Sequence, residues 1–329
     1  MNKIERVRAV LRGDAVDRVP AGFWFHFAPA YRGGEAMAQA HLDYYRATDL
    51  DILKVMNDTG YAPIGRVIVR QPRDWLTLEP TPLSDPLFQS HLEGLKRIVE
   101  AVGREVLVMT TAFNPFHQAV AILQASLQAQ GIEGDARALF VRQVREEPEP
   151  LLRGLQVIAE DSARFFRACI TEAGANGIYY SAQGGERTLM TDAEHAQAVK
   201  AFDLYVLRQI NEVAEFTVGH FCGRGLALER FVDYPVSLVI WAYQADNPSL
   251  REGRALFGGK PILGGMDERG PIVTGPREAI RREIQAALEA LGTRGFMLGA
   301  GCTVPSDIPW ANLIAAREEV AALSRAAAN

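Results

Sequence analysis

Short apolar runs alternate with longer amphipathic segments along the chain, and this alternation constrains the fold more than any other feature. Each run is short enough for a buried strand and each intervening segment is long enough for a helix, which is the pattern of βα units with a parallel sheet. Eight units favour an α/β fold of the (β/α)8 TIM-barrel type over a doubly wound open sheet. The expected strands are residues 19–27, 51–57, 105–113, 177–183, 215–222, 237–243, 261–267 and 295–302.

Cap residues predict where several of the intervening helices begin and end. An Asp-Pro pair, or a Thr followed three residues later by Glu, is typical of a helix start, and Gly is typical of a helix end. Such signals occur at Asp85 and Pro86 with Gly103, at Thr191 with Glu194, and at Pro276 with Gly292.

Two segments depart from the simple alternation. Residues 115–173 contain three successive helical patterns and no strand pattern, which predicts a helical insertion after the third strand. Residues 58–84 are rich in Pro and aromatic residues and predict an irregular excursion that covers the barrel mouth. No low-complexity linker divides the chain, so we expect residues 1–329 to form a single domain.

The composition narrows the class of partner. A net charge of −5 and a pI of about 5.8 lack the basic excess that binding to nucleic acid or an anionic membrane requires. No apolar stretch reaches the roughly 18 residues of a membrane span, and the N-terminus lacks a signal-peptide pattern. The three cysteines suggest no disulfide framework, and Cys169 lies in a helical pattern typical of the core. We expect a cytoplasmic protein with reduced thiols and a small-molecule substrate. The sequence leaves the oligomeric state open, with a homodimer as one option.

Two thiols and one imidazole fall at expected strand ends. His220 and Cys222 end the fifth strand and, being two residues apart, point to the same face. Cys302 ends the eighth strand, and all strand ends of a barrel open onto one mouth. One His and two Cys are ligands that zinc favours, and three ligands leave a position open for substrate. The alternative is that both thiols are core residues, but Gly223 and Gly301 beside them favour tight turns at strand ends.

Five stretches match the motifs of one enzyme family. The first is "RVRAVLRGDAVDRVPAGF", a basic helix followed by an Asp-Arg-Val-Pro turn. It is followed in order by "HFCG", "GKPILGGMD", "GFMLGAGC" and "DIPWANLIAA". In these stretches the chain resembles the uroporphyrinogen decarboxylase family over nearly its whole length. The resemblance implies a (β/α)8 barrel, in agreement with the strand count.

The family contains two chemistries that the N-terminal region helps to separate. True uroporphyrinogen decarboxylases carry an Arg-Gln-Ala-Gly-Arg motif whose arginines hold the substrate's carboxylates. The corresponding region here is "AGFWFHFAPAYRGG", in which an aromatic cluster replaces those arginines. A tetrapyrrole with many carboxylates would find too few cationic partners at this edge. The namesake activity is therefore not expected.

The chain is more similar to the cobamide-dependent methyltransferases of the family. In these enzymes His-x-Cys and a distant Cys bind zinc, and His220, Cys222 and Cys302 match that motif residue by residue. The resemblance implies a small thiol such as coenzyme M and a corrinoid (cobalamin) protein as methyl carrier. Related enzymes have an acidic residue at the end of the sixth strand. Here Gln244 is nearest that position, as a substrate-binding candidate, and either Asp246 supplies the fourth ligand or substrate or water does.

Five further residues are candidates for the barrel mouth. Asp58 resembles the acid that decarboxylases use and could shuttle a proton or bind a cationic group, or it could cap a turn. His26 shares a face with a tryptophan in an aromatic run and could take part in catalysis or pack in the core. Substrate binding is the prediction for Gln183, Asp267 and Trp310, and capping or packing is the alternative for each.

The function that we expect is zinc-dependent transfer of a methyl group between a small thiol or thioether and a carrier such as a corrinoid protein. No Asp-x-His-x-x-Gly pattern of a cobalamin module occurs, so the corrinoid would arrive on another protein or free. The alternatives are a metal-independent decarboxylase of a small carboxylic acid that uses Asp58, a zinc-dependent thioether lyase, and a catalytically silent binding protein. Zinc content separates the decarboxylase from the zinc enzymes.

Overall fold

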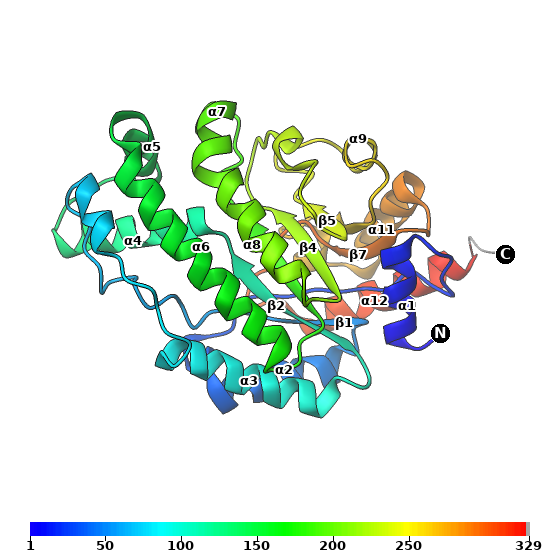
Figure 1. Ribbon diagram of the computed structural model, residues 1–329. Helices are drawn as coiled ribbons and strands as arrows, with labels where there is room; N and C mark the ends of the chain where they lie inside the picture. Colours follow the sequence, from blue (N-terminus) through cyan, green and yellow to red (C-terminus); the bar gives the residue numbers. More distant parts are fainter. Residues whose placement is uncertain (327–329) are drawn as a thin grey trace.

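The computed structural model describes residues 1–326 and contains one parallel sheet that curls into a TIM-barrel-like half-barrel (Figure 1). Neighbouring strands in the sheet are also neighbours in the sequence, in the order β1 to β7. Helices between the strands cover the outside of the sheet, as βα units require. The strands are β1 (Ile52–Val55), β2 (Leu107–Phe113), β3 (Gly177–Ala182), β4 (Phe216–Phe221), β5 (Leu238–Trp241), β6 (Ile262–Met266) and β7 (Phe296–Ala300).

The helices include several short turns of 3-10 type and a five-residue π segment, η3, which joins α7 to α8. In chain order the first eight are α1 (Lys3–Arg12), η1 (Pro29–Tyr31), α2 (Gly34–Thr48), η2 (Pro72–Thr77), α3 (Pro86–Val102), α4 (Pro115–Ala129), α5 (Ala136–Glu146) and α6 (Pro148–Thr171). They are followed by α7 (Asp192–His195), η3 (Ala196–Lys200), α8 (Ala201–Asn211), η4 (Leu228–Phe231), α9 (Leu250–Leu256), α10 (Pro271–Thr274), α11 (Arg277–Leu291) and α12 (Trp310–Ala326).

The prediction of eight strands is wrong by one, because residues 19–27 do not form a strand. This segment is extended but makes a single β-bridge, between Ala21 and Leu298 of β7. Pro20 has no amide hydrogen and can pair only through its carbonyl, which accepts a hydrogen bond from the amide of Leu298 at 2.8 Å. Beyond Gly22, whose amide bonds the Leu298 carbonyl at 2.9 Å, the segment leaves the ladder. It lies between β7 and the residue before β1, since the amide of Asp51 bonds the Ala21 carbonyl.

The other seven expected strands are confirmed, as are the predicted helix signals. Asp85 caps α3 by accepting a hydrogen bond from the amide of Leu87, and Gly103 follows the last residue of α3. Thr191 and Glu194 form the capping box of α7. The remaining predicted pair, Pro276 and Gly292, flanks α11. Local side chain to backbone chemistry therefore determines these boundaries.

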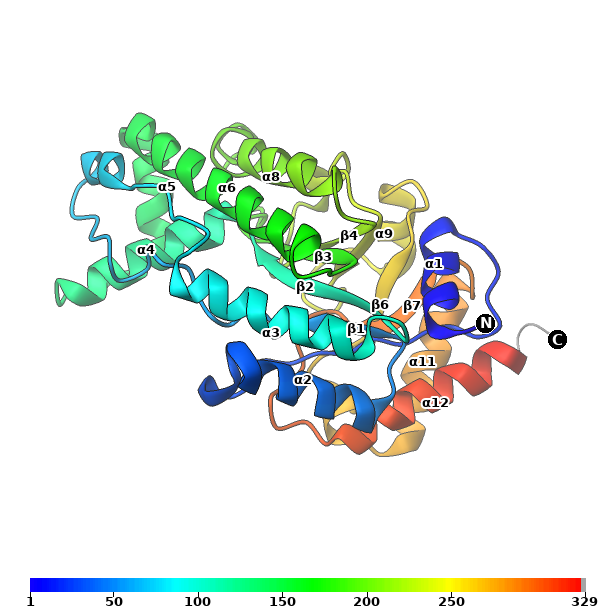
Figure 2. The same cartoon turned by 60° about the horizontal axis from the view of Figure 1, so that its bottom comes forward.

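Three helices, α4 to α6, occupy residues 115–171 between β2 and β3. The longest of them, α6, packs against α3 and α8 in the outer helical layer, whereas α4 and α5 extend beyond the sheet on the side opposite α1 (Figure 2). That this region is an insertion stays a prediction. The irregular excursion, residues 58–84, packs against α5 and α6: Trp75 bonds Gln143 at 2.8 Å, and Tyr61 bonds Asp161 at 2.8 Å.

Alternating strand residues fill the inside of the curled sheet. One interior cluster contains Ile52 and Met56 of the β1 region, Met109 of β2 and Tyr179 of β3. Val7 and Val10 of α1 belong to the same cluster. The strand residues between the interior ones point outward into the larger core beneath the helices. Toward the strand ends the interior becomes polar, with buried Lys54, Thr111, Ser181 and His220. The fold thus gathers reactive side chains at one end of the sheet.

Candidate metal centre

The structure brings His220, Cys222 and Cys302 together. One potential ligand atom from each lies within 4.8 Å of the other two, the only such group of His, Cys, Asp and Glu among residues 1–326. His220 belongs to β4, Cys222 follows β4 directly, and Cys302 follows β7. The predicted convergence of three side chains at the strand ends is therefore confirmed as a placement. Cys169, in contrast, is fully buried in α6, in the core position that its helical pattern predicts.

Glycines shape the two turns that carry the thiols. After β7, a Cβ on Gly301 would lie 2.6 Å from Cα of Ala242 and 3.0 Å from the carbonyl oxygen of Trp241. After β4, Gly223 has a φ of 149°, which side chains rarely allow, and a Cβ there would lie 2.9 Å from Oε1 of Glu186. A side chain at Gly301 would force this turn to shift, and one at Gly223 would be strained by the backbone conformation.

The orientation of His220 fits a ligand role. Its ring is 3% exposed, Nδ1 lies 3.3 Å from the hydroxyl of Ser181, and Nε2 is buried without a protein partner. The ring also packs near Tyr179, with a centroid separation of 5.2 Å. Metal-bound histidines commonly use one nitrogen for the metal and the other for a hydrogen bond. The unpartnered Nε2 and the two sulfur atoms therefore form a donor set suited to zinc.

The two thiols influence each other's ionisation strongly. The neighbouring Cys222 group lowers the pKa of Cys302, with a further contribution from His220. Cys302 in turn raises the pKa of Cys222, and burial adds to this effect. The pair therefore holds one negative charge readily and a second one only at high cost. A bound divalent cation would remove that conflict, since metal ligation requires thiolates.

The residues proposed around the fourth ligand position do not join this group. Asp246 is exposed on a turn with a φ of 57°, and its carboxylate lies near Gly225. Gln244 is also exposed, in the same turn after β5. Neither residue belongs to the group of three candidate metal ligands. The reason is that β5 ends early and its turn moves outward, which strand spacing alone does not reveal.

Asp58 and His26 form a pair near the same end of the sheet. His26 Nδ1 lies 2.8 Å from Oδ1 of Asp58, while the other oxygen of Asp58 is buried without a protein partner. His26 itself is 46% exposed, in contrast to Trp24, which faces the interior, and to Phe25 in the outer core. The structure therefore brings the two predicted catalytic candidates into contact with each other.

The remaining candidates occupy three different places. Gln183 follows β3 and lies beside His117. Burial lowers the pKa of His117, and a hydrogen bond with Gln183 partly opposes this effect. Asp267 follows β6 in a local turn, where it accepts a hydrogen bond from the amide of Arg269 at 2.8 Å and its own amide donates to Glu283 at 2.7 Å. The capping alternative therefore accounts for the contacts of Asp267.

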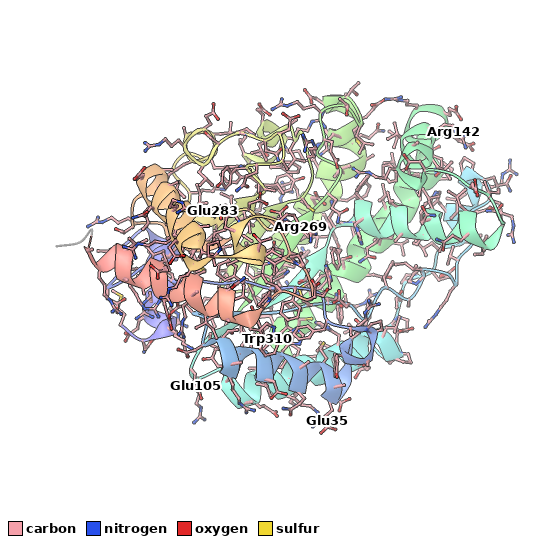
Figure 3. The ribbon with its side chains drawn as sticks, turned by 180° about the vertical axis from the view of Figure 1, so that it is seen from behind. Glu35, Glu105, Arg142, Arg269, Glu283 and Trp310 are labelled. Atoms are coloured by element: carbon pink, nitrogen blue, oxygen red, sulfur yellow. The ribbon has the colours of Figure 1, made fainter. Side chains whose placement is uncertain are left out.

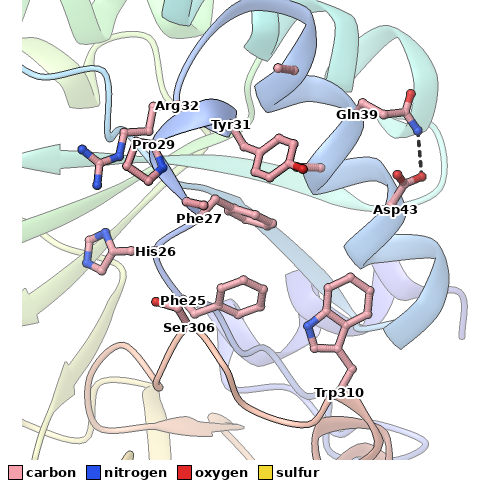
Figure 4. A pocket seen from close by; sticks show the side chains of 13 residues that line it. Phe25, His26, Phe27, Pro29, Tyr31, Arg32, Gln39, Asp43, Ser306 and Trp310 are labelled. Carbon is pink, nitrogen blue, oxygen red and sulfur yellow. Dashed lines mark hydrogen bonds between the residues drawn. The ribbon is translucent and has the colours of Figure 1, made fainter.

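Trp310 lies apart from the thiols, at the start of α12 next to α2 (Figure 3). Its ring packs edge-on against Tyr44, with centroids 5.4 Å apart. It lines a pocket of about 730 Å³ together with Phe25, Phe27 and Tyr31, and His26 stands at the edge of that pocket (Figure 4). Trp310 is thus a pocket residue, but the three candidate metal ligands do not line this pocket.

Three charged residues near the thiols were missed at the sequence level. Lys54 points into the interior of the half-barrel, where burial lowers its pKa and the nearby Cys302 partly opposes this effect. Glu268 is partly buried beside Cys302, and Glu186 lies near Cys222 while it pairs with an arginine of α5 at 2.6 Å. A lysine inside an apolar strand is a sequence signal for Lys54, since lysines are rarely buried. No comparable signal exists for the two glutamates.

Comparison with known proteins identifies similar folds and a family. A methyltransferase from Methanosarcina mazei superposes with a TM-score of 0.76 at 20% identity, over 98% of this chain and 99% of the other. A B12-independent methionine synthase from Shewanella sp. W3-18-1 superposes with a TM-score of 0.59 at 11% identity, over 94% and 99%. No curated protein matches the sequence.

The described helices include none that is both long and apolar enough to cross a membrane. The two superposed structures show that this chain shares its fold with that methyltransferase and that methionine synthase. Family membership itself comes from the sequence. The profile described as "Uroporphyrinogen decarboxylase (URO-D)" matches residues 52–323, from the first strand to the last helix, so the chain belongs to the uroporphyrinogen decarboxylase family.

Proposed function

We propose that this protein is a zinc-dependent methyltransferase that moves a methyl group between a small thiol or thioether and a carrier. The observation that supports this most is the convergence of one imidazole and two thiols within 4.8 Å at the strand ends. Nitrogen and sulfur donors in this ratio suit zinc, and three protein ligands are typical of a catalytic site that keeps a position for substrate. Closed structural sites usually have four.

Zinc bound by these residues would supply one chemical effect, namely that a substrate thiol is held as thiolate at neutral pH. The chain's own part is to present His220, Cys222 and Cys302 from two separate strands, with Ser181 beside the imidazole. The partly buried position of the thiols limits access of water to the reacting sulfur.

Methyl transfer needs no change in the protein's own covalent structure. The substrate sulfur forms a bond to the methyl carbon while the bond from that carbon to the carrier breaks, and the electron pair of the broken bond stays on the carrier. In the reverse direction the carrier attacks the methyl carbon of a thioether and the sulfur leaves with the electron pair. A corrinoid protein is the carrier that we propose, with its cobalamin held outside the 329 residues of this chain.

The pair of Asp58 and His26 favours a second candidate, decarboxylation of a small carboxylic acid. The two side chains lie 2.8 Å apart, and one carboxylate oxygen faces no protein donor. A pair of this kind could move a proton to the carbon that loses CO₂. This chemistry needs no metal, so the first experiment below separates the two candidates.

The first test is the zinc content of protein purified without added metal, for the wild type and for Cys222→Ala and Cys302→Ala. We expect about one zinc per chain in the wild type, because the three donor atoms are already close together. Each substitution removes one of three ligands, so both variants should lose most of the zinc. Atomic absorption measured against protein concentration gives the ratio.

Cys169→Ala is the matched control, since Cys169 is buried in α6 away from the metal-ligand group. This variant should keep the wild-type zinc content. A wild type without zinc, or zinc that survives both ligand substitutions, contradicts the proposal and favours decarboxylation through Asp58.

A further inference from the structure

Lys54 has an unusual position inside the curled sheet. It lies in the middle of β1 between Ile52 and Met56, which both face the interior, so its side chain points inward as well. It is only 4% exposed. Its ammonium nitrogen lies 3.8 Å from the ring centre of Tyr179 and 4.8 Å from that of Trp24. Aromatic faces stabilise a cation in such a position.

The ammonium group lacks an anionic partner at ion-pair distance. Within residues 1–326 no carboxylate forms a salt bridge with Lys54, and its one protein acceptor is the sulfur of Met56 at 3.2 Å. Burial lowers the pKa of Lys54 to about 7, while the charges of Cys302, Asp58 and Cys222 oppose this effect. Asp58 is already paired with His26. A buried cation of this kind is costly unless an anion comes near it.

Two further polar groups lie beside Lys54, and neither has a protein hydrogen-bond partner. The indole nitrogen of Trp24 and the hydroxyl of Tyr179 are both buried and unpaired, although their rings form the two walls around the ammonium. The ring of Tyr179 in turn packs on His220. Two hydrogen-bond donors without a protein partner therefore lie beside an ammonium group whose one protein acceptor is a thioether sulfur. Buried donors in native proteins are normally satisfied, so this cluster indicates a ligand that accepts hydrogen bonds.

We propose that Lys54 is a specificity-determining residue whose positive charge favours an anionic sulfur, a thiolate, over a neutral thioether at the open position of the metal centre. The inference rests on the function proposed above. Two cysteinates and one neutral imidazole cancel the double charge of zinc, so an added thiolate leaves one negative charge in a buried site. Lys54 balances that charge, whereas a thioether brings none. At short range and low dielectric, this difference has a large effect on binding.

The experiment compares two small probes that differ in whether they can become anionic. 2-Mercaptoethanol and 2-(methylthio)ethanol are titrated into the zinc-loaded wild type, Lys54→Met and Lys54→Arg, and binding is followed by calorimetry. We expect Lys54→Met to bind the thiol at least tenfold more weakly, while its affinity for the thioether changes less than twofold. Lys54→Arg keeps the charge and should retain the wild-type preference for the thiol.

Zinc content and melting temperature are measured for every variant, and Lys54→Gln replaces Lys54→Met if the latter does not fold. The inference is overturned if the neutral variant binds both probes as the wild type does, or loses both equally, since the second outcome indicates a role in packing. It is also overturned if the wild type does not prefer the thiol. A wild type without zinc refutes the proposed function itself, and this inference with it.

Discussion

At the scale of single residues, side-chain alternation, the strand ends and the family resemblance together predicted that the three candidate metal ligands lie close to one another. His220 and Cys222 are two residues apart on one strand, and Cys302 follows the last strand, so their convergence follows from the parallel sheet. Lys54 required the structure, because its importance depends on two aromatic rings from distant segments. Asp246 was predicted as a fourth ligand but does not join the candidate metal ligands, because the turn after β5 places it elsewhere.

Gly301 offers a test of how the backbone places a ligand. In Gly301→Ala the added methyl group meets the backbone of Trp241 and Ala242, which cannot move aside easily. The turn must shift and take Cys302 with it, so we expect zinc affinity to fall by roughly tenfold or more, about 1.4 kcal/mol. Competition with a chromophoric chelator measures the affinity.

Gly134→Ala is a suitable comparison for this prediction. A Cβ at Gly134 would make an ordinary contact with Leu127, 3.5 Å away, in the connection between α4 and α5. This variant should bind zinc as the wild type does. Unchanged zinc affinity in Gly301→Ala would show that the turn tolerates a side chain.

At the scale of helices and strands, cap residues predicted helix boundaries correctly, whereas strand-like composition did not predict the strand pairing of residues 19–27. Capped helices such as α3, α7 and α11 begin or end at the residues that cap chemistry predicts. Residues 19–27 have the composition of a strand but not its hydrogen bonds, because Pro20 lacks a donor and the chain then leaves β7. Composition shows which side chains fit the surface of a strand. Hydrogen-bond pairing depends also on whether the fold places a neighbouring strand alongside.

Asp203 joins several elements through one buried carboxylate. It lies on α8 and accepts hydrogen bonds from Tyr180 of β3, from Tyr234 after η4, and from Asn114, which caps α4. Burial nevertheless raises the pKa of Asp203 to about 7, and the hydrogen bonds only partly oppose this. In the unfolded chain the group has an ordinary pKa of about 3.9.

The sign of the pH dependence follows from this difference. Between about pH 4 and pH 7 the native protein holds a proton on Asp203 that the unfolded chain has lost, so the free energy of unfolding should decrease as pH rises through this range, by up to about 1.4 kcal/mol per pH unit. Above pH 7 this contribution is constant. Asp203→Asn should lose this dependence, and urea unfolding of both proteins at several pH values measures it.

The same slope in the wild type and in Asp203→Asn would show that other groups cause the pH dependence. The buried histidines titrate in part of the same range, since burial lowers the pKa of His41 and His195 to about 4 each. Both proteins contain them, so the difference between the two unfolding curves isolates Asp203.

At the scale of the whole molecule, a buried ion network lies where the N-terminal segment meets the sheet. Asp51, fully buried just before β1, accepts from Arg6 at 2.9 Å and from both terminal nitrogens of Arg18 at 2.8 Å. The amide of Ala21 also donates to it, at 3.0 Å. One carboxylate thereby ties α1, the extended segment and the first strand together.

Asp51→Ala should therefore be strongly destabilising. The substitution leaves the buried guanidinium of Arg6 without one partner and Arg18 without both of its bonds, and such losses typically cost about 3–5 kcal/mol. Asp14→Ala is the matched control, because Asp14 pairs with Arg12 in the open, with both side chains more than half exposed, and exposed pairs contribute about 1 kcal/mol or less. Urea unfolding compares the two, and similar losses would mean that the network is dispensable.

The bridge between Ala21 and Leu298 also has a consequence for biosynthesis. It joins two segments from near opposite ends of the described chain, so this contact has a very high contact order and cannot form until β7 has left the ribosome. Until then, the Pro20 carbonyl and the Gly22 amide lack their partner, Leu298, and are free to pair with another nascent chain. The contact that links the N-terminal segment to the last strand of the half-barrel therefore forms late, and the nascent chain is most exposed to aggregation before it forms.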